Sequence, residues 1–429
     1  MVKKYEKNIC LYLHAHQPYR LTKLNYLDLG QYNNYFEGSD PHTNKFYIDK
    51  ISTKSYLPTN KILQNLLESV ENFSLSLSLT GTLLGQLEEY SPESLKSFIK
   101  LSSTSKVEIL SETYHHTLAS IYSLEEFCEQ IVLHRSLIKS LFNYETKSFR
   151  NTELIYNDKI ASIISELGFQ AIITEGWDPI LNWKSSNFIY NSNLLELTTK
   201  EKDTIKKHKI GRTHKELKLL LKNYRLSDDL AFRFSNKTWD QYPLTIDKFI
   251  GWIKETDGEV FNLFMDYETF GEHQWEDSGI FEFLKKLPTE ANKVGIGFLT
   301  ISEAAEIKSK GIIEIENLIS WADVERDLSA WLGNKMQQSA LAKVYELEPK
   351  LKSGLERIKN KNLYNKYLDD WRKLQVSDHF YYMSTKYWSD GDVHKYFSPY
   401  DSPYEAFINY MNVIEDFSQK VEFELNKQR

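Results

Sequence analysis

Short apolar runs of strand length alternate with longer amphipathic patterns through the first three quarters of the chain. The run 73–79 alternates strictly between apolar residues and Ser, which is typical of a β-strand. The predicted strands span residues 9–13, 73–79, 107–110, 148–153, 169–174, 230–234, 260–266 and 295–300. Because strands that alternate with helices pair in parallel, seven or eight such units predict a closed β/α barrel. The alternative is a doubly wound open sheet, but no Gly-rich phosphate loop follows the first strand.

Helical patterns fill the spaces between these strands. Residues 124–141 predict one long helix, and Asn157-Asp158 can cap another that Gly168 would end. The stretch 181–218 is the least regular part and is expected to be an insertion over one face.

The pattern changes at about Trp321, where strand signals disappear. Helices are predicted for residues 323–351, 363–383 and 403–425, with a loop at 387–402 that is rich in Asp, Gly and Tyr. The prediction is therefore a catalytic barrel over residues 1–320, followed by a C-terminal α-helical bundle over residues 321–429 that completes the substrate groove.

Composition narrows the function. The chain has 429 residues, of which 41% are hydrophobic, so it can bury a large core. Its 60 acidic residues outnumber its 53 basic residues and no long basic run occurs, which argues against a nucleic-acid partner. The 27 Tyr, 23 Phe and 9 Trp are an unusual number of aromatics. A large core accounts for many of them, but aromatic rings also stack on the apolar faces of sugars.

Cysteine use and hydropathy suggest a compartment. Cys10 and Cys128 are expected to be buried thiols, and two lone cysteines make no disulfide framework. The apolar run 9–13 is too short for the core of a signal peptide, and no segment approaches the length of a membrane span. We expect a cytoplasmic protein without a membrane partner.

Two carboxylates stand at the ends of predicted strands. Glu153 and Asp266 each follow apolar strand residues and precede polar sequence, which in a barrel places the side chain on the active face. A pair of carboxylates from different strands can cleave a glycosidic bond. A single Asp or Glu more often caps a helix or forms a salt bridge, and spacing alone does not separate this pair from Glu175, Glu268 or Glu272.

Histidines gather in the same way. His14 and His16 lie two residues apart at the end of the first strand and point to the same side of an extended chain. His115 and His116 follow the third predicted strand. These imidazoles could bind a metal ion or donate hydrogen bonds to sugar hydroxyls.

Five segments, in this order, resemble the signatures of glycoside hydrolase family 57, the α-amylase and 4-α-glucanotransferase family. They are His14-Ala15-His16-Gln17-Pro18, Thr80-Gly81-Thr82-Leu83-Leu84, the segments around Glu153 and Asp266, and Ser377-Asp378. A lone His-x-His is weak evidence, whereas five segments in order are specific. The likeness is closest to the α-amylase-like members, which have a segment similar to Trp321-Ala322-Asp323.

The resemblance implies an incomplete (β/α)7 barrel followed by a helical bundle, retention of anomeric configuration, and no metal or cofactor. It implies that Glu153 is the nucleophile and Asp266 the general acid/base. His14, His16, His116 and Asp378 would hold the sugar, with His115 the alternative to His116 because the doublet leaves the alignment open by one. Trp177 and Trp331 are further candidates for stacking on sugar rings.

The sequence thus predicts an α-amylase-like retaining hydrolase of α-1,4-glucans such as starch, glycogen or maltodextrins. A 4-α-glucanotransferase or branching enzyme of the same family is the alternative. A metal-dependent polysaccharide deacetylase and a non-catalytic glucan-binding protein are the alternatives from other classes. The deacetylase would need Asp-Asp and His-x-x-x-His spacings, which we do not find.

Overall fold

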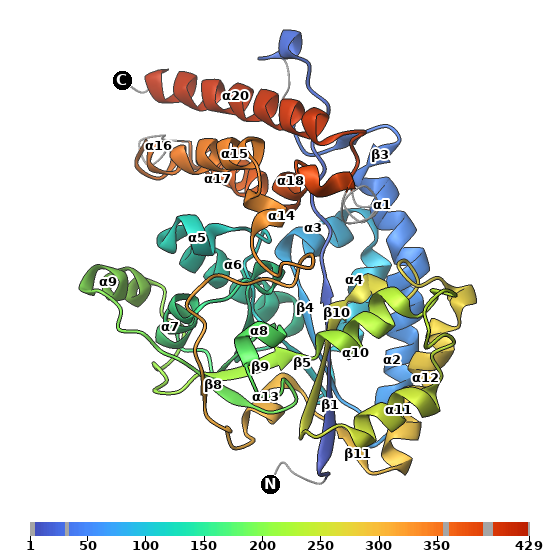
Figure 1. Cartoon of the computed structure of the whole chain (residues 1–429). Helices are drawn as coiled ribbons and strands as arrows, with labels where there is room; N and C mark the ends of the chain where they lie inside the picture. Colours follow the sequence, from blue (N-terminus) through green and yellow to red (C-terminus); the bar gives the residue numbers. More distant parts are fainter. Residues whose placement is uncertain (1–4, 31–33, 355–359, 389–397, 428–429) are drawn as a thin grey trace.

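The computed structural model describes residues 5–30, 34–354, 360–388 and 398–427. A barrel of parallel strands forms its lower part, and helices from the C-terminal quarter lie across the top (Figure 1). The barrel strands, in chain order, are β1 (Lys7–Ala15), β4 (Leu75–Leu79), β5 (Val107–Ile109), β6 (Ser148–Arg150), β7 (Ala171–Glu175), β9 (Lys218–Lys222) and β10 (Val260–Asp266).

Neighbours in the chain are neighbours in the barrel. β1 pairs in parallel with both β10 and β4, β4 pairs with β5, and β7 pairs with both β6 and β9. Ser111 bridges to Phe149 and so joins β5 to β6. The N–H of Asn223 donates to the carbonyl of Asn262 at 2.9 Å and joins the end of β9 to β10. These seven strands enclose one interior, which confirms the predicted incomplete barrel and excludes the open sheet.

One predicted strand is wrong. Residues 230–233 lie in the π-helix η4 (Asp229–Arg233), which Phe234 caps, and the sixth barrel strand is β9 instead. Leu230 and Phe234 are buried while Phe232, between them, is 58% exposed, so the apolar spacing is helical and not that of a strand. β9 begins at the last residue of the irregular stretch 181–218 and was not predicted. That stretch also contains β8 (Tyr190–Ser192) and α9 (Thr199–Lys207).

Other predicted elements shift at their ends. Residues 295–300 contribute only β11 (Ile296–Phe298), which pairs with the first residues of β1. The strand predicted at 148–153 ends at Arg150 and is followed by the 3-10 turn η3 (Thr152–Leu154). The helices α6 (Leu124–Phe142) and α7 (Asp158–Leu167) form where predicted. Asn157 accepts from the N–H of Ile160 at 3.0 Å, and Gly168 ends α7 at a φ of 109°.

The C-terminal quarter is helical in the described residues. Its helices are α14 (Ser329–Leu332), α15 (Lys335–Glu346), α16 (Glu348–Gly354), α17 (Lys361–Leu374), α18 (Ser377–Tyr381) and α20 (Pro403–Lys427). The helix predicted from residue 323 begins only at Ser329, because Asp323 and Arg326 adopt positive φ values of 55° and 52°. Of the loop predicted at 387–402, residues 389–397 lie outside the described residues.

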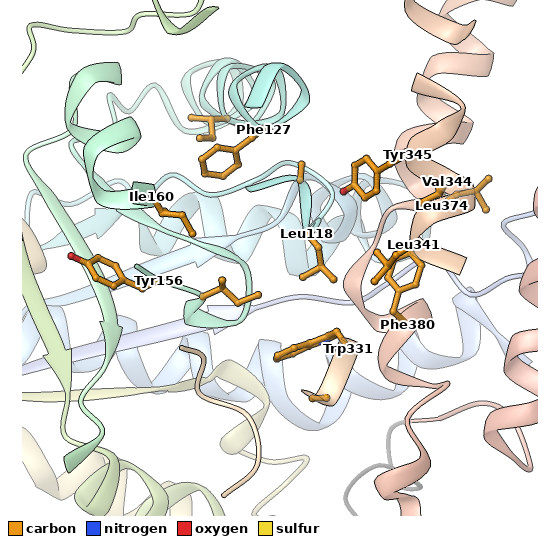
Figure 2. Packing of buried hydrophobic residues seen from close by; sticks show 14 of the residues in the cluster. Leu118, Phe127, Tyr156, Ile160, Trp331, Leu341, Val344, Tyr345, Leu374 and Phe380 are labelled. Atoms are coloured by element: carbon orange, nitrogen blue, oxygen red, sulfur yellow. The ribbon is translucent and has the colours of Figure 1, made fainter. Parts of the chain in front are cut away.

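One apolar core joins these helices to the barrel. Figure 2 shows Phe127 of α6 and Ile160 of α7 on one side of this core, with Leu341 of α15 and Phe380 of α18 on the other. Each such buried side chain stabilises the contact by about 1.5–3 kcal/mol. The bundle is therefore fixed over the carboxyl ends of the strands. No helix in the described ranges is long and apolar enough to cross a membrane.

Candidate active site

A cavity of about 560 Å³ opens at the carboxyl ends of the barrel strands. Its walls include side chains from strand ends, from the π-helix η4 and from the C-terminal helices. They include His14, His16, His116, Glu153, Lys222, Phe232, Asp266, Glu268, His273, Trp321, Val324, Arg326, Trp331, Asp378, Tyr381 and Tyr382. Because residues far apart in sequence meet here, both the barrel and the C-terminal helices contribute to the site.

Glu153 projects from the turn after β6 and is held from three sides. Its Oε1 accepts a hydrogen bond from His116 Nε2 at 3.1 Å and from the Ser377 hydroxyl at 3.3 Å. Its Oε2 accepts from the indole N–H of Trp321 at 2.7 Å. Although burial raises the pKa of Glu153, the hydrogen bond and charge of His116 hold that pKa below its usual value. The carboxylate is thus fixed and ionised.

The backbone is strained around this group. Glu153 and His116 have φ values of 56° and 53°, in the left-handed region that non-Gly residues adopt at a cost of about 1–3 kcal/mol. Leu154, Asp323 and Arg326 share this conformation. The other described non-Gly residues with positive φ are both Asn, which tolerates it. Strain that the surrounding structure must maintain is thus concentrated at this cavity.

Asp266 is the last residue of β10 and faces the cavity, with its side chain 37% exposed. Its Oδ1 lies 3.6 Å from His14 Nδ1. Burial raises the pKa of Asp266, but the hydrogen bond and charge of His14 outweigh this and lower it. Both Glu153 and Asp266 therefore favour the ionised form.

Three imidazoles form a stack between these carboxylates and Asp378. The ring centroid of His116 lies 4.1 Å from that of His16 and 5.0 Å from that of His14. His16 donates from Nε2 to Asp378 at 3.0 Å and accepts the Thr80 hydroxyl at Nδ1 at 2.8 Å. Burial lowers the pKa of His16 to about 4, so its neutral ring has this one N–H to donate. His16 and Asp378 thus present fixed polar groups to the cavity.

The sequence matches a known family. The family model of glycosyl hydrolase family 57 matches residues 10–316. The chain belongs to this family. It is therefore a glycoside hydrolase. A Methanocaldococcus jannaschii protein with the curated name "Putative alpha-amylase" is 41% identical to it, and the match covers 97% of this chain and 86% of the relative.

Solved structures share the fold. The branching enzyme of family 57 from Pyrococcus horikoshii has a TM-score of 0.65 at 15% identity and covers 99% of this chain and 94% of its own. The α-amylase AmyC from Thermotoga maritima has a TM-score of 0.60 at 13% identity, covering 99% and 96%. The 4-α-glucanotransferase from Thermococcus litoralis has a TM-score of 0.55 at 17% identity; the match covers 92% of this chain but only 54% of that enzyme.

Two sugar-binding candidates of this family 57 enzyme lie outside the cavity walls. His115 Nδ1 bonds to the Thr82 hydroxyl at 3.1 Å, and its Nε2 lies 3.7 Å from Asp369. Trp177 packs against the large apolar core instead. Trp331 does line the cavity, but it is only 1% exposed and belongs mainly to that core. Of the histidine doublet, the structure brings only His116 to Glu153.

The carboxylates that spacing could not separate from the pair have other partners. Glu272 pairs with Lys50 and lies 3.7 Å from Lys54. Glu175 is buried, 3.7 Å from Lys222 and 3.8 Å from Arg326. Each of these two carboxylates is therefore matched by basic side chains.

Glu268 differs from both, because it borders the cavity beside Asp266. It accepts from the Tyr56 hydroxyl and from Gln17 Nε2, the latter at 3.2 Å. Burial, followed by the charge of Asp266, raises the pKa of Glu268 to about 8, so this neighbour carries a proton at neutral pH. Asp266 and Glu268 thus favour opposite protonation states.

Sequence reasoning missed three side chains at the site. Glu112 and Arg150 are fully buried below the imidazoles, and Trp321 contacts Glu153. Arg150 and Lys222 lie 5.2 and 5.4 Å from the centre of the Trp321 ring, which places positive charge over it. Glu112 stands in the polar segment after the third predicted strand, the same signal that identified Glu153, and Arg150 is a charge within a strand.

The same imidazoles are candidate ligands for the metal ion that a deacetylase would need. His14, Glu112 and His116 lie close enough to one another to hold a cation. However, the Arg150 guanidinium lies 3.7 Å from the same Glu112 oxygen. Burial lowers the pKa of His116, but its bonds to Glu112 and Glu153 prevail and raise it to about 9. A protonated imidazole beside a guanidinium does not ligate metals. We therefore expect this cluster to hold a proton on His116 and not a metal ion.

Proposed function

We propose that this enzyme cleaves α-1,4 bonds of glucans such as starch, glycogen and maltodextrins, with retention and through a covalent glycosyl-enzyme. Glu153 is the nucleophile and Asp266 the general acid/base. The observation that carries this proposal is that both carboxylates reach one cavity from the carboxyl ends of barrel strands in a family 57 chain. The names of the listed relatives, an amylase, a branching enzyme and a glucanotransferase, support an α-glucan substrate.

In the first step, an oxygen of Glu153 attacks the anomeric carbon as the bond to the glycosidic oxygen breaks. Asp266 gives its proton to that leaving oxygen. The charge of His14 favours ionised Asp266, and the further burial of this carboxyl under a bound substrate would raise its pKa so that it takes up the proton. In the second step Asp266 takes a proton from water, which attacks the ester and releases the sugar and Glu153.

The sugar ring at the cleavage point is held by His14, His16, His116 and Asp378, with Trp331 at the wall. Fixed donors and acceptors of this kind orient hydroxyl groups. The helices after residue 320 complete the groove, because Trp321, Ser377 and Asp378 all approach Glu153 or its histidines. We also propose a cytoplasmic location. It is supported by the two buried cysteines, which are free thiols as expected in a reducing compartment.

The test is product analysis with maltoheptaose and glycogen, in the presence of a chelator. We expect wild type to release sugars whose first-formed anomer is α by NMR. Glu153→Gln and Asp266→Asn should each lose nearly all activity, the latter by about 10²–10⁴-fold. Glu272→Gln, a lysine-paired carboxylate six residues after Asp266, is the matched control and should stay active.

Other outcomes separate the alternatives. Longer oligosaccharides with little new reducing end would indicate transfer, and new branch points would indicate a branching enzyme. A β-anomer would refute retention. Chelator-sensitive release of acetate from an acetylated polysaccharide would support the deacetylase. Tight binding without product would indicate a binding protein.

A further inference from the structure

The two proposed catalytic carboxylates are joined below the cavity by an unbroken series of ionisable groups. Asp266 Oδ1 lies 3.6 Å from His14 Nδ1, and His14 Nε2 lies 3.1 Å from Glu112 Oε2. The same Glu112 oxygen lies 3.6 Å from His116 Nδ1, and His116 Nε2 donates to Glu153 at 3.1 Å. Each imidazole thus lies between Glu112 and one member of the pair.

We propose that Glu112 is a positioning residue that keeps a proton on His116 throughout the reaction and thereby maintains the orientation and ionisation of Glu153. The proposal rests on the function proposed above and adds a role for a third carboxylate, which does not touch the substrate. Glu112 stands three residues after the end of β5, is 0% exposed, and is absent from the cavity walls.

Burial makes Glu112 depend on nearby positive charge. An isolated carboxylate costs several kcal/mol to bury. Among the described residues, its Oε1 has no hydrogen-bond partner, so Oε2 must meet the whole requirement. His14 Nε2 lies within hydrogen-bond distance of Oε2 at 3.1 Å, whereas His116 Nδ1 and Arg150 Nη1, at 3.6 and 3.7 Å, act on it as nearby charges. An imidazole that loses its proton would therefore remove needed charge.

His116 also faces the neutral ring of His16, whose centroid lies 4.1 Å away, and the charge of Asp378, which favours a proton on His116. Arg150 Nη1 also lies 3.3 Å from His116 Nδ1 and opposes protonation there. His134 receives the N–H of Glu112 at its Nδ1, at 3.4 Å, and so stays unprotonated on that side. Tyr12, whose pKa burial raises, stays neutral. Burial and Arg150 act against a charged His116, but Glu112 and Glu153 outweigh them and its pKa rises to about 9.

The need for Glu112 is greatest in the covalent intermediate. When Glu153 becomes an ester it loses its negative charge, and His116 then keeps only one of its two carboxylate partners. Glu112 retains the proton on His116 at that stage, so His116 can donate again as the ester is hydrolysed and Glu153 regains its charge. His116 therefore neither gains nor loses a proton during the cycle.

The test compares Glu112→Gln with Glu108→Gln, another buried carboxylate four residues earlier, in β5, but bound by serines. The kcat of Glu112→Gln should be close to wild type at pH 5.5, where His116 is protonated either way. At pH 8 it should fall at least about tenfold, because only wild type keeps the proton. Glu108→Gln should show no such growth of the loss with pH. An equal loss at both pH values would mean that Glu112 is merely structural.

A second measurement follows the protonation of His116 directly and does not depend on activity. The ¹⁵N NMR titration of His116 in wild type, assigned with His116→Asn, should show a pKa near 9, and in Glu112→Gln it should fall by at least about one unit. Titration of wild-type His116 at an ordinary imidazole pKa would overturn the inference. If wild type releases no sugar, the proposed function fails instead, and the titration still decides the state of His116.

Discussion

Two layers of the barrel interior compensate the charge of a buried carboxylate in different ways. Below, on β5, Glu108 accepts from the hydroxyls of Ser148 and Ser76 at 2.7 and 3.3 Å and from the N–H of Ser302 at 2.7 Å. Above, four residues later, Glu112 faces His14, His116 and Arg150. The lower layer compensates the carboxylate with neutral donors, whereas the upper layer uses groups that gain or lose protons. The residue type is the same, and its surroundings decide whether it can take part in chemistry.

The largest difference between the layers should appear on β6, which supplies Arg150 to the upper layer and Ser148 to the lower one. Arg150→Met should lower the free energy of unfolding by about 3–5 kcal/mol, because it leaves Glu112 without its permanent counter-charge. Ser148→Ala removes one neutral donor and should cost about 1 kcal/mol. Urea unfolding at pH 7 measures both. Similar costs for the two variants would mean that the layers do not differ.

The second difference concerns the pH dependence of stability. The bonds to Glu112 and Glu153 raise the pKa of buried His116 to about 9, above its unfolded value of about 6.5. The stability that this gives is fully present below pH 6.5 and is lost as pH rises through 9, on the order of 3 kcal/mol in all. We expect wild type and Glu108→Gln to lose stability over this window and Glu112→Gln to lose much less. Urea midpoints at pH 6 and pH 9.5 decide this, and equal slopes in all three proteins would contradict it.

A third difference lies in the hydrogen bonds of two tryptophans. Trp321 donates to ionised Glu153 at 2.7 Å, whereas buried Trp371 donates to the carbonyl of Val344 at 2.8 Å. Hydrogen bonds to charged groups contribute about 1.5–3 kcal/mol. Trp321→Phe should therefore lower kcat/KM by roughly 10- to 100-fold. Trp371→Phe should reduce stability but leave kcat/KM near wild type, and a comparable loss of kcat/KM in both would show that packing, not this bond, matters.

The sequence was sufficient for the parts of the fold that depend on local pattern. The bounds of β10 were predicted to the residue, because an unbroken apolar run ends in Asp266. β9 was missed since its buried run of three Leu is short and flanked by Lys, and the nearby helical turn with Phe232 has a similar composition. Periodicity of so few residues does not distinguish strand from helix.

The sequence predicted the site residues that stand at the ends of predicted strands. Glu153, Asp266 and His14 stand at such ends, and the structure brings them to one cavity. Glu112 and Arg150 matter through each other and through the imidazoles above them, and no linear spacing records those pairings. A charge within a predicted strand, such as Arg150, is a signal in the sequence that requires an explanation, because burying it requires a partner.

The smallest expected effect separates the two neighbouring histidines. His116 lies between Glu112 and Glu153, whereas His115 points to Thr82 and Asp369, and burial lowers the pKa of His115 to about 3, so it stays neutral. His115→Asn should cost about 1 kcal/mol of stability for the lost bond and leave the pH dependence of kcat unchanged. His116→Asn should lower kcat at every pH. The contrary outcome is a pH profile that His115→Asn alters as strongly as Glu112→Gln does. It would show that the ionisable upper layer includes His115 as well as the groups that face the cavity.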